Sequence, residues 1–96
     1  MIFLIEPPLP SSEKKEAVRY LIAHVPIETR EEIAMIIKKE GSDWEINHHY
    51  DIGITVRNLL REGGFLWDPI ELDNVWAELI EKAVKKTVTT KRSQKL

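Results

Sequence analysis

The residues with the clearest capacity for chemistry lie between positions 49 and 58. If these residues form a helix, His49 falls in the middle of an apolar arc. The members of that arc are Ile52, Val56, Leu59 and Leu60. A histidine in this position is predicted to be largely buried, and a buried imidazole needs a partner for at least one ring nitrogen.

Gly53 and Arg57 lie on the flank of the same arc, and Asn58 lies on the far side. A glycine inside a helix costs up to about 1 kcal/mol relative to alanine, so Gly53 indicates close approach of a neighbouring group or a ligand. Arg57 carries five N–H donors that could reach across the edge of this groove.

Two interpretations of this cluster stay open. In the structural one, His49 is a core histidine, Gly53 a helix crossing point and Arg57 the partner of a carboxylate. In the functional one, the cluster lines a pocket for an anion or small ligand. Its candidate binding residues are then His49, Tyr50, Gly53, Arg57 and Asn58.

The segment His49-Tyr50-Asp51-Ile52-Gly53-Ile54-Thr55-Val56-Arg57-Asn58 also resembles the signature of a family of small uncharacterised prokaryotic helical proteins. That signature reads roughly His-aromatic-Gly-Leu-Gly, two residues, then Ile-Arg-Asn. Asp51 stands where the family has glycine, and Thr55 where it has an aromatic residue. The resemblance extends over roughly residues 12–84 and implies a fold and a candidate patch, but no activity.

Other kinds of chemistry find little support. Glu45 and His48 have the Glu-x-x-His spacing of carboxylate-bridged iron sites, but such sites need two of these pairs and two further glutamates. The chain has no cysteine, no Gly-rich phosphate loop and no nucleophile elbow. We therefore assign no catalytic residue, no metal site and no cofactor, and favour a non-enzymatic protein.

Four amphipathic helices are expected to position these residues. Apolar spacing predicts them at about residues 13–24, 30–40 and 69–86, with one more helix lying within about residues 45–61. Thr29 followed by Glu32 indicates a capping box, Asp68-Pro69 a helix start, and Gly41 and Gly63-Gly64 helix ends. Because 96 residues suit one domain, we predict an all-α bundle in which residues 11–86 form a single helical domain.

The two ends of the chain are expected to differ from the bundle. Residues 1–10 should form an extended apolar arm, because Pro7, Pro8 and Pro10 prevent a helix there. Residues 87–96 should form a flexible tail. Residues 1–81 hold all 16 acidic residues and 8 basic ones, whereas residues 82–96 hold 6 basic and no acidic residues, so the tail is basic.

The candidate partner-binding residues are apolar and aromatic side chains outside the helical stripes. They are Ile2, Phe3, Leu4, Trp44 and Trp67. The two tryptophans either close the ends of the bundle or form an exposed patch. With the arm, they favour a binding or accessory module that acts on a protein partner or forms a homodimer.

Two alternative functions remain: ligand binding by the His49/Arg57 groove, and weak nucleic-acid binding by the basic tail. The acidic body would oppose the second, so a nucleic-acid partner is not favoured. The chain has no signal-peptide pattern and no apolar run of about 20 residues. We therefore expect a cytoplasmic protein that does not enter a membrane.

Overall fold

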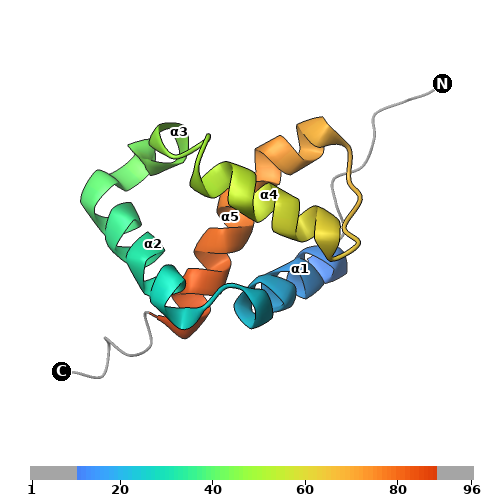
Figure 1. Ribbon diagram of the computed structural model, residues 1–96, viewed down its shortest axis with the longest axis horizontal. Helices are drawn as coiled ribbons and strands as arrows, with labels where there is room; N and C mark the ends of the chain where they lie inside the picture. Colours follow the sequence, from blue (N-terminus) through green and yellow to red (C-terminus); the bar gives the residue numbers. More distant parts are fainter. Residues whose placement is uncertain (1–10, 89–96) are drawn as a thin grey trace.

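The computed structural model describes residues 11–88, and these residues are almost entirely helical (Figure 1). The elements are α1 (Ser11–His24), α2 (Ile27–Glu40), the 3-10 helix η1 (Gly41–Asp43), α3 (Trp44–Asn47), α4 (Ile52–Glu62) and α5 (Pro69–Thr87). No strand occurs in this part of the chain, which confirms the predicted all-α bundle. The predicted arm, and the tail beyond residue 88, lie outside the described residues.

The core is organised around α5. The helices α1, α2 and α4 all pack against it (Figure 1). The buried residues of α5 are Leu72, Val75, Trp76, Ala77, Leu79, Ile80, Ala83 and Val84. Burying one large aliphatic or aromatic side chain contributes about 1.5–3 kcal/mol, so this helix carries much of the apolar stabilisation. None of the helices within residues 11–88 has the length and apolar character needed to cross a bilayer.

Several helix ends follow from local sequence as predicted. The Asp68 carboxylate accepts a hydrogen bond from the Ile70 N–H at 3.0 Å, and Pro69 takes the first position of α5. Gly41 follows α2 with a φ of 63°, and Gly64 follows α4 with a φ of 90°. Both angles lie in the left-handed region that glycine adopts without a steric penalty.

The predicted start of the second helix was wrong by three residues. The helix α2 begins at Ile27 after Pro26, so Thr29 lies inside its first turn and does not cap it. The Arg30 N–H donates to the Pro26 carbonyl at 3.0 Å, and the buried Arg30 Nε donates to the Val25 carbonyl at 3.0 Å. These bonds fix the short turn between α1 and α2.

The helix predicted within residues 45–61 occupies only part of that range, because a turn at residues 48–51 separates the short α3 from α4. Asp51 caps α4, and its side chain accepts a hydrogen bond from the Ile52 N–H at 2.6 Å. An aspartate competes for backbone N–H groups and therefore favours a helix start over a helix interior. His49 consequently lies in the turn, with 30% of its side chain exposed, and is not largely buried.

Candidate functional site

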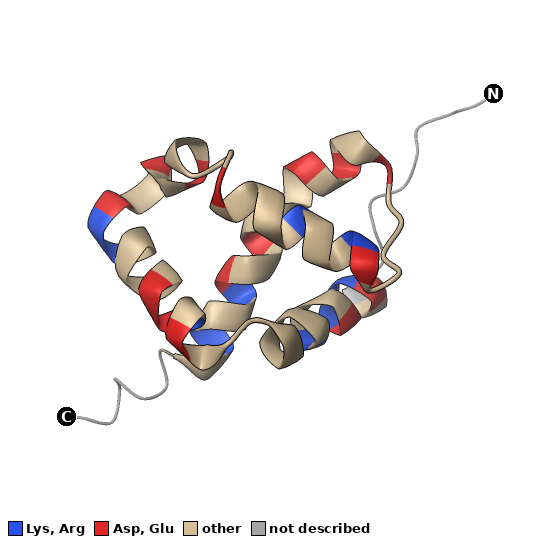
Figure 2. Cartoon of the chain, viewed as in Figure 1, with Lys and Arg blue, Asp and Glu red and all other residues tan. Residues whose placement is uncertain are grey.

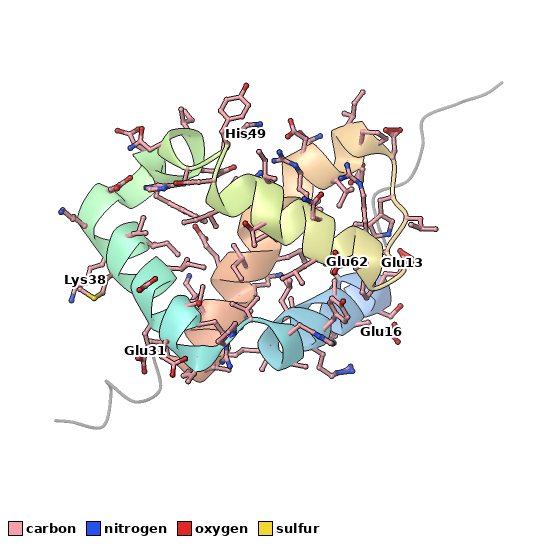
Figure 3. The ribbon with its side chains drawn as sticks, viewed as in Figure 1. Glu13, Glu16, Glu31, Lys38, His49 and Glu62 are labelled. Carbon is pink, nitrogen blue, oxygen red and sulfur yellow. The ribbon has the colours of Figure 1, made fainter. Side chains whose placement is uncertain are left out.

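The structure brings His49 and Arg57 together through an acidic residue of α5. Asp73 Oδ1 lies 3.5 Å from His49 Nε2 and 3.5 Å from Arg57 Nη1. Figure 3 shows His49 at the turn between α3 and α4. The sequence pattern missed Asp73 as part of this cluster, because it lies on a different helix and sequence spacing does not reveal that contact.

Gly53 lies where two side chains approach the α4 backbone. A Cβ atom at this position would lie 3.0 Å from Arg57 Nη1 and 3.1 Å from the Trp76 ring. Arg57 is only 14% exposed, and its buried Nη1 makes no hydrogen bond within the described part of the chain. The Arg57 side chain therefore contributes packing, while Asp73 balances its charge. An anion at this place would have to compete with that carboxylate.

The other candidate ligand residues lie differently. The Tyr50 side chain is 81% exposed, and its ring meets the His49 ring edge-on at a centroid distance of 4.8 Å. Asn58 is exposed and accepts a hydrogen bond from Arg61 Nη1, on its own helix, at 3.2 Å. The structure thus places the Tyr50 ring beside His49. The side chain of Asn58 instead contacts Arg61 on its own helix.

Both tryptophans of the candidate partner surface close the bundle. Trp44 is 2% exposed, its Nε1 donates to Glu81 at 2.7 Å, and its ring meets Trp76 edge-on. Trp67 is partly buried, and its Nε1 donates to Glu13 at 2.9 Å. Trp44 is therefore a core residue. Of the two alternatives, closing the bundle or forming an exposed patch, the structure shows the first for Trp44. Ile2, Phe3 and Leu4 lie outside the described residues.

A second candidate site is a groove of about 310 Å³ between α2 and α4. In Figure 1, α2 lies to one side of α5 and α4 crosses in front of α5. Ile80 of α5 lines the groove between α2 and α4. The buried residues form its floor, namely Val25, Ile33, Val56 and Ile80. The partly buried Ile36 and Ile52 form its walls, and the exposed residues Thr29, Glu32, Asp51 and Thr55 form its rim.

The charged residues of the rim are acidic. Glu32 belongs to α2 and Asp51 to the turn before α4, so both elements that flank the groove contribute an acidic residue to its rim. Figure 2 shows acidic residues on α2 and at the start of α4. The apolar stripes that contain Ile33 and Val56 were visible in the sequence. The space between these stripes was not visible in the sequence, because it depends on the distance between α2 and α4 where both pack on α5.

His48 closes one end of this groove with a three-residue bridge. Its Nε2 lies 3.1 Å from Glu40 Oε2 at the end of α2, and its Nδ1 lies 3.1 Å from Asp51 Oδ2. Asn47 donates to the other Glu40 oxygen at 2.9 Å. A protonated imidazole can donate to both carboxylates at once, so the bridge ties the end of α2 to the start of α4.

The charges of this bridge support one another. The hydrogen bond with Glu40, and then that with Asp51, raise the pKa of His48 above 6.5. The hydrogen bonds from Asn47 and His48 lower the pKa of Glu40, and the Ile52 N–H is the main cause of the lowered pKa of Asp51. The sequence pattern missed this role of His48, because Glu40 lies eight residues earlier on another helix.

No group of three or more histidine, aspartate or glutamate side chains within residues 11–88 could hold a metal ion. Comparisons with protein-family models, curated proteins and solved structures find no match to this chain. The resemblance of residues 49–58 to a family signature therefore stays a prediction.

The role of Arg57 can be tested by separating its stem from its charge. Methionine at position 57 keeps most of the buried apolar stem and removes the unbonded Nη1. We expect Arg57→Met to unfold in urea within about 1 kcal/mol of the native chain, and Arg57→Ala to lose about 1–2 kcal/mol more. An equal loss in both variants would instead mean that the ion pair with Asp73 holds the fold.

The His48 bridge should make stability depend on pH. Because the folded-state pKa of His48 is raised, its contribution is fully present below pH 6.5 and is lost as the pH rises through the folded-state pKa. The contributions of Glu40 and Asp51 are present above pH 4.5 and 3.8, respectively, and are lost at lower pH.

We therefore expect His48→Gln to lower the urea midpoint more at about pH 5.5 than at about pH 8.5. The double variant Glu40→Gln/His48→Gln serves as the control. If the two residues interact, Glu40→Gln should lower the urea midpoint less in the His48→Gln background than in the native chain. A midpoint difference that is the same at both pH values would contradict the bridge.

Proposed function

We propose that this protein is a non-enzymatic, cytoplasmic binding module that takes up an apolar segment of polypeptide in the groove between α2 and α4. The observation that carries this proposal is how apolar and polar residues are distributed in the groove. The floor is apolar throughout, and the exposed polar side chains lie at the rim.

This distribution is typical of protein interfaces, which combine a dry apolar centre with a polar edge. Two helices that flank an apolar floor are also the arrangement that accepts apolar side chains from a helix or extended segment. A site for a small ligand usually has a few polar groups deep inside that fix the ligand's orientation. In this groove, the buried lining residues are all apolar, and both ring nitrogens of the partly buried His48 at one end already meet carboxylates, those of Glu40 and Asp51.

The apolar surface around the groove supports the same proposal. Of the seven exposed large apolar residues in the described part of the chain, five belong to α2, α3, α4 or the turn between α3 and α4. They are Ile27, Met35, Ile46, Tyr50 and Ile54. Single exposed apolar residues are ordinary, and none of these five lines the groove itself. Their concentration on α2, α4 and the segment that joins these helices nevertheless favours a binding surface in this part of the molecule.

The two alternative functions gain less support. The anion pocket at His49 and Arg57 already contains the Asp73 carboxylate. Most of the basic tail, which would carry a contact with nucleic acid, lies outside the described residues. We therefore carry forward the α2–α4 groove as the binding site, with no catalytic residue assigned.

The groove can be tested with Nile red, a neutral dye whose fluorescence increases in apolar sites. We expect the native chain to bind the dye at one saturable site, and Ile36→Asp to weaken this binding about tenfold, because it places a charge in the apolar wall. Ile70→Asp is the matched control, since it changes an isoleucine of α5 that is 71% exposed and does not line the groove.

Circular dichroism should show the same helix content in both variants, so that loss of binding is not loss of fold. If the dye binds both variants equally, or does not bind the native chain, the proposal is overturned.

A further inference from the structure

We propose that, when no partner is bound, the groove is occupied by the apolar segment Met1-Ile2-Phe3-Leu4-Ile5 of the same chain. The site itself rests on the proposed function, and the inference adds its resident occupant and a form of regulation. A partner would then have to displace this segment to bind.

The apolar segment and the groove are chemically complementary. Residues 1–5 are five consecutive apolar residues, and the groove offers an apolar floor with walls from Ile36 and Ile52. Bringing these two apolar surfaces together removes both from water, which is favourable in proportion to the area covered. The acidic rim does not oppose this contact, because residues 1–5 carry no acidic side chain.

The spacer between the apolar segment and α1 is long enough for the segment to reach the groove. The groove ends at Val25, which follows α1 directly, and α1 begins at Ser11. A helical rise of 1.5 Å per residue puts Val25 about 21 Å from Ser11. Phe3 precedes Ser11 by eight residues, which span about 25 Å when extended at about 3.1 Å per residue. Residues 1–4 can therefore reach the groove by running back along α1, and Ile5, whose span is about 19 Å, then lies at the entrance beside Val25.

The residues between the segment and α1 favour that extended path. Pro7, Pro8 and Pro10 fix φ near the value of the polyproline helix and restrict the residues before them to extended conformations. A spacer of this kind holds the apolar segment away from the start of α1.

The apolar segment of the same chain also has a higher local concentration at the groove than that of a second copy. A segment tethered by a short spacer has an effective concentration on the order of millimolar at a site that it can reach. The same segment of a second copy is present only at the total protein concentration, which is micromolar in dilute solution. The segment of the same chain therefore outcompetes the second copy.

The absence of cysteine from the sequence makes a direct test possible. In the variant Phe3→Cys/Thr55→Cys, one thiol is placed in the apolar segment and one on the exposed rim of the groove. Mild oxidation should give a disulfide within one chain, because docking brings the two Cα atoms within the distance of about 7 Å that a disulfide needs. Non-reducing electrophoresis and mass spectrometry distinguish this product from a crosslinked dimer.

Phe3→Cys/Glu62→Cys is the matched control. Glu62 is exposed and adjoins Gly63, which lies against Tyr20 in the middle of α1, so an undocked segment reaches it without entering the groove. We expect the Thr55 pair to form its disulfide about fivefold faster or more than the Glu62 pair. Equal rates, a faster control or a crosslinked dimer as the main product would each overturn the proposal.

A second measurement separates this inference from the proposed function. Phe3→Asp should free the groove and tighten Nile red binding about threefold or more, because apparent affinity scales with the fraction of open groove. Adding Ile36→Asp should abolish that gain. An unchanged dye affinity in Phe3→Asp would contradict docking of residues 1–5.

The two proposals can fail independently. If crosslinking fails while the dye still distinguishes Ile36→Asp from Ile70→Asp, the groove is a binding site without a resident segment. If crosslinking succeeds while the dye never distinguishes those variants, in Phe3→Asp as in the native chain, the segment is part of the fold and the proposed function fails.

Discussion

Burial of the α5 surface is the constraint on which the rest of the structure depends. Its apolar residues face α1, α2 and α4, and each of these helices is placed mainly by the part of α5 that it covers. The helices α1 and α4 also pack against each other, whereas α2 packs on α5 and on the short elements that follow it. The groove between α2 and α4 follows from this arrangement, since neither helix needs the other to bury its apolar stripe.

Polar contacts hold α2 at both ends and leave its middle open. At its start, the buried Arg30 donates to the Val25 carbonyl, and at its end Glu40 meets His48. Between these ties, Ile33 and Ile36 face the groove. Such hydrogen bonds contribute less than apolar burial, about 0.5–1.5 kcal/mol each, but their direction fixes where the ends of the helix lie. The architecture thus combines a firmly packed centre with one helix that presents an apolar surface.

The parts of the fold that were predictable from the sequence depend on local rules. The start of α5 at Asp68-Pro69 and the end of α2 at Gly41 follow from capping chemistry and backbone sterics. The interruption at residues 48–51 was not predicted, because the apolar spacing continues through it. There the Asp51 cap and the burial of Trp44 against Trp76 outweigh the helical periodicity.

The candidate site was predictable only in part, for a related reason. Gly53 correctly indicated close approach, and the structure shows Arg57 and Trp76 at that position. The partners Asp73 for Arg57 and Glu40 for His48 lie on other helices, so no spacing along the chain identifies them. A groove is a property of the distance between helices, and sequence patterns report the apolar faces without that distance.

Native-state hydrogen exchange tests the central claim most directly, namely that α2 is held less firmly than the α5 core and leaves an open groove. The account predicts that amides in the middle of α5, around Trp76 and Ile80, exchange at the rate of global unfolding. Amides in the middle of α2, around Ile36, should exchange much faster, through a local opening of lower free energy. Equal protection of the two helices would contradict the account, since α2 would then be as firmly packed as the core.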